Sequence, residues 1–167
     1  SKFGPAYAGL KILTFEEILK KFSCQTVMNI HLKTLHNSDE YDPDLLTRIV
    51  KLIHDYDCEK YVYFMSGNDN LLALARKIAP HIPCCAGGGS APWDIVDRAI
   101  RLGCYKVQLF KPYFNAEMIE KAHRNGIVCN VFYSDDAEET KKYIDMGIDT
   151  NLTNDYNLIS QSVKRKK

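Results

Sequence analysis

The sequence alternates between predicted strands and predicted helices along nearly its whole length. Strands are predicted at residues 27–34, 60–65, 81–86, 105–110, 128–132 and 149–152, and a helical pattern follows each of them. The repeat of about 23 residues leaves room for one helix between consecutive strands, so the strands are expected to run parallel in right-handed βαβ units. Because no linker-like or low-complexity segment interrupts the pattern, we expect a single α/β domain over residues 1–167.

Alternation of this kind is compatible with a TIM-type (β/α)8 barrel and with an open, doubly wound sheet. The dinucleotide-binding form of the open sheet carries a Gly-x-Gly-x-x-Gly motif after a strand, and this sequence has none. That form therefore loses support, but the alternation alone does not separate the two architectures.

Short motifs mark where several predicted helices begin and end. Residues 14–17 (TFEE) form a capping box, and Asp42-Pro43 combines a capping carboxylate with a proline at the first helical position. Asn115 is expected to cap a later helix, and Gly147 to end another.

Composition excludes several classes of protein. The formal net charge of +1 gives no electrostatic reason to expect a nucleic-acid partner. No apolar run is long enough to span a membrane and no signal peptide opens the chain, so a cytoplasmic location is expected. The six cysteines include no Cys-x-x-Cys pair and are expected to be reduced, mostly buried thiols rather than metal ligands.

The strand predicted at residues 27–34 has an unusual polar face. Its apolar residues alternate with Asn29, His31 and Lys33, so these three side chains are expected to point the same way. Strands of a parallel sheet are covered on both faces, and the mouth of a barrel is the polar environment that such a face needs. We therefore expect His31 and Lys33 to be functional. The alternatives are a polar face satisfied by its neighbours and a solvated edge strand.

The run Gly87-Gly88-Gly89 follows a predicted strand and precedes a helix. Backbone N–H groups in such a loop can hold a phosphate. The Lys-Ser/Thr pair of a P-loop is absent, so a flexible turn is the alternative.

Several segments together resemble the glycerophosphodiester phosphodiesterase family, whose fold is a TIM barrel. Residues 11–19 (KILTFEEIL) resemble the family's IPTLEEVL, and the strand at residues 27–34 resembles its NIEIK strand. Residues 63–80 resemble a family segment with a strand-end serine, a Leu-Leu pair and a later proline. Residues 130–136 and 145–155 resemble VWTVND and MGVDGIITD. The matches occur in the family's order over nearly the whole chain.

The resemblance begins after the first two strands of the family barrel. The His-Arg-Gly and Glu-x-Asp motifs, which supply a catalytic histidine and metal-binding carboxylates in the family, are absent from this sequence. The chain therefore corresponds to strands three to eight, a TIM-type barrel truncated to about six βα units. Six parallel strands leave two edges without partners, so we expect self-association or a compensating segment.

The resemblance also implies roles for single residues. Lys33 matches a family lysine that contacts phosphate. His31 stands where the family has a third metal-binding glutamate, and it is expected either to hydrogen-bond the substrate in catalysis or to bind a softer metal ion. The family implies Mg²⁺ or Ca²⁺ as the cofactor. Further substrate contacts are expected at the ends of later strands, from Ser66, Lys111, Phe132 and Asn154.

Structural roles are the alternatives for three of these: Ser66 as a turn residue, Lys111 as a solvated cation and Phe132 as core packing. The implied activity is hydrolysis of glycerophosphodiesters to glycerol 3-phosphate and an alcohol. Two other hypotheses remain open. One is a barrel remnant without catalysis that binds a phosphorylated ligand or serves in assembly. The other is an unrelated phosphate-binding protein that uses Gly87–Gly89.

Overall fold

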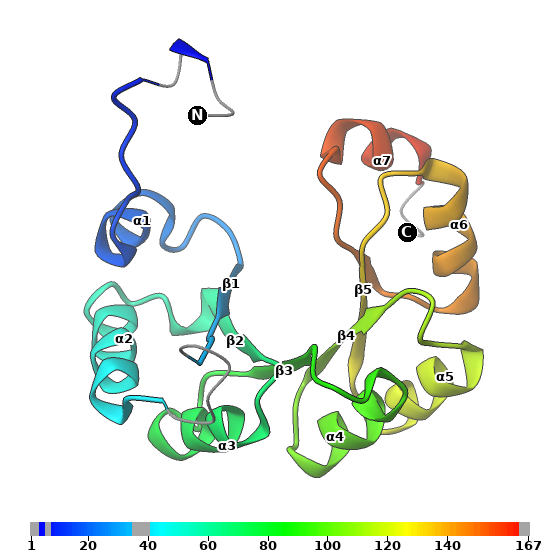
Figure 1. Cartoon of the computed structure of the whole chain (residues 1–167), viewed down its shortest axis with the longest axis horizontal. Coiled ribbons are helices and arrows are strands. Elements are labelled where there is room, and N and C mark those ends of the chain that lie inside the picture. The colour runs from blue at the N-terminus through cyan, green and yellow to red at the C-terminus, as the bar shows by residue number, and fades with distance from the viewer. Residues whose placement is uncertain (1–3, 6–7, 35–40, 164–167) are drawn as a thin grey trace.

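The computed structural model describes residues 4–5, 8–34 and 41–163 of the chain. Six strands run parallel in one sheet, in the order in which they occur along the chain. The sheet curls and helices cover its outer face, so that it forms half of a TIM-type barrel, as predicted (Figure 1). The strands are β1 Met28–His31, β2 Val62–Ser66, β3 Cys84–Gly87, β4 Lys106–Phe110, β5 Val128–Phe132 and β6 Thr150–Asn151.

Three helices begin at capping residues that the sequence predicts: Thr14, Asp42 and Asn115. The Thr14 hydroxyl accepts the Glu17 N–H at 3.2 Å while the Glu17 carboxylate accepts the Thr14 N–H at 2.8 Å. Asn115 accepts the Met118 N–H at 3.0 Å. The helices are α1 Phe15–Phe22, α2 Pro43–Asp55, α3 Asp69–Ile78, α4 Ile95–Arg101, α5 Ala116–Arg124, α6 Ala137–Met146 and α7 Tyr156–Ser162, with the short 3-10 turns η3 Glu59–Tyr61 and η4 Pro92–Asp94.

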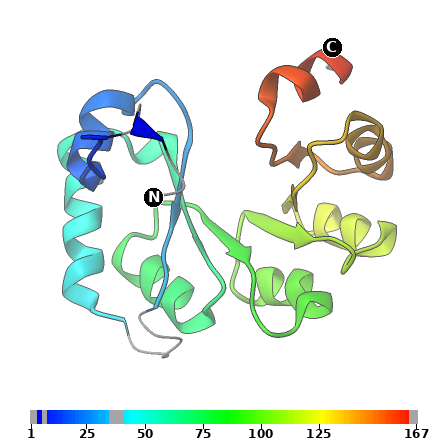
Figure 2. The ribbon, with the colours of Figure 1, turned by 45° about the horizontal axis from the view of Figure 1, so that its top comes forward.

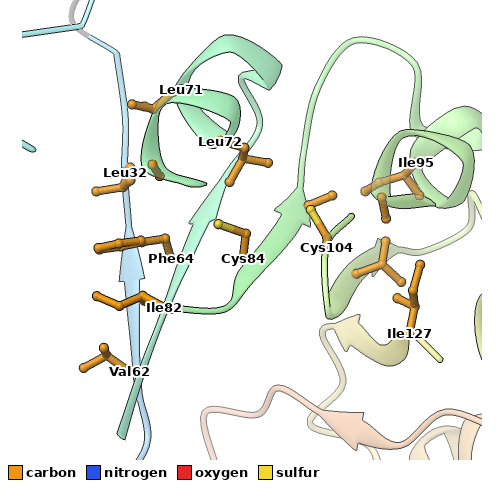
Figure 3. Packing of buried hydrophobic residues seen from close by; sticks show 14 of the residues in the cluster. Leu32, Val62, Phe64, Leu71, Leu72, Ile82, Cys84, Ile95, Cys104 and Ile127 are labelled. Atoms are coloured by element: carbon orange, nitrogen blue, oxygen red, sulfur yellow. The ribbon is translucent and has the colours of Figure 1, made fainter. Parts of the chain in front are cut away.

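The hydrophobic core lies between the outer face of the sheet and the helices. Figure 3 shows part of it, with Val62, Phe64 and Cys84 from the strands and Leu72 and Ile95 from α3 and α4. Burying a side chain as large as Phe64 contributes roughly 2 kcal/mol to folding. All six cysteines are free and five of them are buried, which confirms the prediction of mostly buried thiols.

The face of the sheet that points away from the helices carries a row of polar side chains on β4 to β6. The strand register places Gln108, Asn130 and Thr150 side by side on it. The Asn130 amide donates to Gln108 Oε1 at 3.3 Å, and the Thr150 hydroxyl donates to Asn130 Oδ1 at 2.9 Å. Lys106 is buried on the same face, with its ammonium 5.2 Å from the ring centre of Tyr63. Polar side chains that hydrogen-bond one another on this face suit the interior of a barrel better than contact with a second hydrophobic layer.

The sheet does not close within the described residues. Strands β1 and β6 are the outer strands, and each pairs with one neighbour only. Figures 1 and 2 show α1 and α7 on the two sides of the opening. Both edges that the sequence predicts to be open are therefore open in the structure.

Strands β1 and β3 differ from their predicted bounds. Strand β1 ends at His31, so Lys33 lies in the loop that follows, although the Leu32 N–H still donates to the Met65 carbonyl at 2.8 Å. Strand β3 begins at Cys84 rather than at residue 81, because Pro83 has no N–H to donate and the preceding residues form a turn.

Among the residues that the structure describes, no helix is both long enough and apolar enough to cross a membrane.

Candidate active site

A cavity of about 850 Å³ lies at the carboxyl ends of strands β1 to β4. In α/β barrels this end of the sheet carries the active site, because the loops after different strands converge there. The lining comes from the ends of four neighbouring strands, the loops after them, and helices α3 and α4: His31, Leu32, Lys33, Thr34, Ser66, Gly67, Asn68, Asp69, Asn70, Gly87, Gly88, Gly89, Ser90, Ala91, Arg98, Gln108 and Phe110.

His31 and Lys33 lie on the same wall of this cavity. His31 is the last residue of β1 and Lys33 follows two residues later, with its side chain exposed. Partial burial of the ring lowers the pKa of His31 below its usual value of 6.5, and the positive charge of Lys33 lowers this pKa further. Near neutral pH the imidazole is therefore uncharged and can accept a proton, while Lys33 supplies the positive charge.

The loop after β2 forms the next part of the wall. Ser66 ends the strand and is 1% exposed, and its hydroxyl accepts the Asn68 N–H at 3.1 Å. Asn68 in turn caps helix α3 by accepting the Leu71 N–H at 3.0 Å. The turn role that was the alternative for Ser66 is thus present, and it places the serine at the cavity.

The glycine loop Gly87–Gly89 faces this serine loop across a short distance. Gly88 and Gly89 have φ angles of +80° and +106°, which favour glycine. A Cβ atom on Gly67 would lie 3.0 Å from the Gly87 carbonyl oxygen and 3.1 Å from the Gly89 nitrogen. The close approach of the two backbones therefore requires glycine at position 67, while the positive φ angles favour glycine at positions 88 and 89.

Two charged residues that line the cavity, Arg98 and Asp69, were not predicted from the sequence. Arg98 is buried in α4, and its guanidinium pairs with the Asp69 carboxylate of α3 at 2.6 Å. Arg101 pairs with the other carboxylate oxygen at 2.7 Å. Burial opposes ionisation of Asp69, but the hydrogen bonds and charges of the two arginines outweigh it and lower the pKa of this carboxyl group. In the sequence, Arg98 has the pattern of an ordinary helix-surface residue, and nothing local indicates its partner.

The other three predicted substrate contacts lie outside the cavity. Lys111 pairs with Glu139 at 2.7 Å, and the Asn154 side chain donates to Asp135 at 2.9 Å. The Phe132 ring lies 5.2 Å, centre to centre, from the ring of Phe110, which does line the cavity. Phe132 is thus one ring removed from the cavity, while Lys111 and Asn154 are engaged elsewhere.

The described cavity residues do not fit a hard divalent cation. Mg²⁺ and Ca²⁺ prefer several oxygen ligands, whereas the described lining contains one carboxylate, Asp69, which two arginines already neutralise. His31 offers an imidazole nitrogen, which suits softer ions better.

A separate group of donor atoms lies elsewhere in the fold. The ligand atoms of His123, Cys129 and Asp149 lie within 4.8 Å of one another. His123 and Asp149 pair at 3.0 Å, and Cys129 belongs to the core on the outer face of the sheet. Burial raises the pKa of the Cys129 thiol to about 12, with a further contribution from Asp149, so the thiol stays protonated. This group is not part of the cavity.

Comparisons with known proteins agree with this architecture. The family model described as "Glycerophosphoryl diester phosphodiesterase family" matches residues 2–158. A glycerophosphodiester phosphodiesterase from Caldanaerobacter subterraneus subsp. tengcongensis is 27% identical over 172 residues, which cover 98% of this chain and 67% of that protein.

Solved structures share the fold. A glycerophosphodiester phosphodiesterase from Parabacteroides distasonis matches with a TM-score of 0.71 at 20% identity, over 88% of this chain and 60% of that chain. An Oleispira antarctica phosphodiesterase in complex with the product sn-glycerol-3-phosphate matches with a TM-score of 0.68 at 18% identity, over 81% and 54% of the two chains. The chain thus spans 54–62% of the length of five solved structures that it matches. Because the family model covers nearly all of its residues, the chain belongs to the glycerophosphoryl diester phosphodiesterase family.

Proposed function

We propose that this chain carries the phosphate-binding part of an active site that hydrolyses glycerophosphodiesters to sn-glycerol 3-phosphate and an alcohol. The observation that supports this most is the cavity itself, in which Lys33 and His31 meet Gly87–Gly89 at the carboxyl ends of the strands. The structure of the Oleispira antarctica phosphodiesterase was solved in complex with its product sn-glycerol-3-phosphate, which is the product that we propose for this site.

The cavity residues suit the chemistry of a phosphodiester. Its anionic oxygens repel nucleophiles, and the Lys33 ammonium offsets that charge as it grows in the transition state. The uncharged imidazole of His31 can take a proton from the attacking group and return it to the leaving alkoxide. We propose that Phe110 and Phe132, whose rings pack against each other, form an aromatic wall beside the glycerol moiety. For Lys111 and Asn154, which are paired outside the cavity, we propose only an indirect role.

The metal requirement limits what the chain is expected to do alone. Members of the family generally depend on a divalent metal ion, and the described cavity residues do not supply the oxygen ligands for one. We therefore propose that the remaining ligands come from polypeptide outside the described residues. The 167-residue chain is expected to bind phosphate esters and to hydrolyse diesters weakly or not at all.

A substrate assay with matched variants tests this function. We would measure release of sn-glycerol 3-phosphate from glycerophosphocholine in the presence of Mg²⁺, Ca²⁺ or a chelator, together with binding of the product. Lys33→Ala is expected to weaken product binding by about tenfold, as expected for the loss of a charged contact. Lys60→Ala, at the opposite end of the sheet, serves as the control and should leave binding unchanged.

Equal binding by the unchanged chain and Lys33→Ala would contradict the proposed phosphate site. Chelator-sensitive turnover close to that of the Caldanaerobacter protein would contradict the proposal that ligands are missing. Binding without turnover agrees with the proposal and equally with a second candidate function, a phosphate-binding module without catalysis. The pairing of Asp69 with two arginines, rather than its availability to a metal, is the observation that supports this alternative.

The open edges and the free thiols support two further proposals about the chain's surroundings. We propose that β1 and β6 pair with further polypeptide, which includes a second copy of the chain when no other strand is present. We also propose a cytoplasmic location, because all six cysteines, each within the described residues, have free thiols.

A further inference from the structure

Arg98 connects the two loops that face each other across the cavity. One guanidinium nitrogen, Nη1, donates to the Gly88 carbonyl at 2.6 Å, and Nη2 donates to the Gly67 carbonyl at 2.9 Å. The Nε and Nη2 atoms also donate to Asp69 Oδ1, at 3.0 and 2.6 Å. Although it starts from a helix, this side chain is only 10% exposed. The loops after β2 and β3 and the start of α3 are thus held by one planar group.

The oxygens that Arg98 binds are those that would repel an anion. The Gly67 and Gly88 carbonyl oxygens carry partial negative charge, and Asp69 is the carboxylate in the described cavity lining. A phosphate entering a cavity with these oxygens unengaged would meet negative potential on two sides. With all three groups bonded to one guanidinium, their negative charge is offset, and Lys33 is the other cation of the described cavity lining.

The backbone of the two loops packs closely around the Arg98 guanidinium. A Cβ atom on Gly89 would collide with the Arg98 guanidinium, and one on Gly67 would press against the Gly87 oxygen and the Gly89 nitrogen. Glycines at both places let the loops approach until a single side chain reaches both carbonyls. The two glycines and Arg98 therefore contribute to the same close approach of the two loops.

We propose that Arg98 is a positioning residue that makes the cavity accept a phosphate, by holding the loops after β2 and β3 together and turning their carbonyl oxygens and Asp69 toward itself. This inference rests on the proposed function, because it assumes that the cavity binds a phosphate ester. It adds a role for a residue that contributes its guanidinium to the loops rather than to the reacting atoms.

Neighbouring Arg101 provides a natural comparison. It has the same charge and binds the same Asp69, through Oδ2 at 2.7 Å, but its side chain is 61% exposed and no bond to either loop carbonyl is among the contacts of the described residues. A role that depends on charge alone would be shared by both arginines. A role that depends on the planar fork would belong to Arg98, since a guanidinium presents its donors in a fixed plane and an ammonium does not.

The test uses binding of sn-glycerol 3-phosphate, measured by titration calorimetry at a temperature where every variant is folded. Arg98→Lys keeps the charge and Arg98→Gln removes it, while Arg101→Gln removes a similar charge from the same carboxylate. Both Arg98 variants are expected to raise the dissociation constant by about tenfold, and Arg101→Gln by less than about threefold. Amide NMR signals of Gly67, Gly88 and Gly89 should shift in both Arg98 variants and stay unchanged in Arg101→Gln.

The outcomes separate the inference from the function on which it rests. If Arg98→Lys binds as tightly as the unchanged chain, the role is one of charge and the positioning proposal is wrong. If both Arg98 variants lower the melting temperature but bind normally when folded, Arg98 is structural only and the proposal is also wrong. If the unchanged chain fails to bind the ligand, the proposed phosphate site is itself refuted, and the role of Arg98 with it.

Discussion

At the scale of single residues, the properties of the cavity depend on a histidine that lies close to a lysine. His31 and Lys33 stand two residues apart and line the same wall. Burial of the ring lowers the pKa of His31, and Lys33 lowers it further because two positive charges so close together repel. A bound phosphate would offset this repulsion, so ligand binding and protonation of His31 are expected to be coupled.

This coupling predicts a pH dependence with a definite sign. In the free chain, His31 is expected to titrate below 6.5 in an NMR titration of its ring protons, and Lys33→Met should move its pKa upward. A glycerophosphodiester keeps one negative charge between pH 5 and 8 and should raise the pKa of His31, so its binding should tighten as the pH falls. A titration of His31 that neither Lys33→Met nor the ligand alters would contradict this coupling. Lys60→Met is the control.

The same lowered pKa also affects folding. Between 6.5 and the lower pKa in the folded chain, the unfolded chain binds more protons, so the free energy of unfolding should fall as the pH drops through this range. We expect His31→Asn to reduce this pH dependence in urea denaturation at pH 7.5 and 5.5. An identical pH dependence in His31→Asn and in the unchanged chain would contradict it.

At the scale of helices and strands, the local motifs explain why so much of the fold could be predicted. A cap at Asn115 or Thr14 depends on atoms three residues apart, and those atoms are in the sequence pattern itself. The existence of all six strands was likewise predictable, whereas the start of β3 was not, because the turn before Pro83 displaces it. Local sequence patterns predict the existence of a helix or strand more reliably than its first and last residues.

The cap at Asn115 can be tested directly. Asn115→Ala removes the acceptor for the Met118 N–H and should lower the free energy of unfolding by about 1 kcal/mol in urea denaturation. Asn115→Ser retains a capping oxygen and should lose much less. If the serine and alanine variants lose the same amount, the side chain does not act as a cap.

The site was less predictable than the elements that support it. His31, Lys33, Ser66 and Gly87–Gly89 could be proposed because they follow strands whose carboxyl ends meet. Arg98 could not, since its three partners lie 10, 29 and 31 residues earlier in the chain. Residues that act through long-range contacts leave no periodic signal in a single sequence.

At the scale of the whole molecule, the two open edges of the sheet matter most. Within the part of the chain that the structure describes, strands β1 and β6 pair on one side only. Apolar side chains are exposed beside both, Val27 next to β1 and Leu152 next to β6. Unpaired edges flanked by exposed apolar residues favour association with other strands.

Light scattering can detect this association. We expect an apparent mass above 19.1 kDa that falls on dilution toward that of one chain. Val27→Lys and Leu152→Lys should shift the chain toward the monomer, because a charge beside an edge disfavours pairing. Trp93→Lys, which changes another exposed apolar side chain away from both edges, should have no effect. A mass of 19.1 kDa at all concentrations would refute the prediction.

The order of the strands has a consequence for how the chain can fold and vary. Each strand lies beside the strands that precede and follow it in sequence, so no strand inserts between two earlier ones. Contacts therefore join mainly consecutive βα units, as in a repeat protein, and folding can spread from one unit to the next without first closing a long loop. In a sheet assembled in this order, gaining or losing a unit at one end changes the neighbours of the adjacent unit alone.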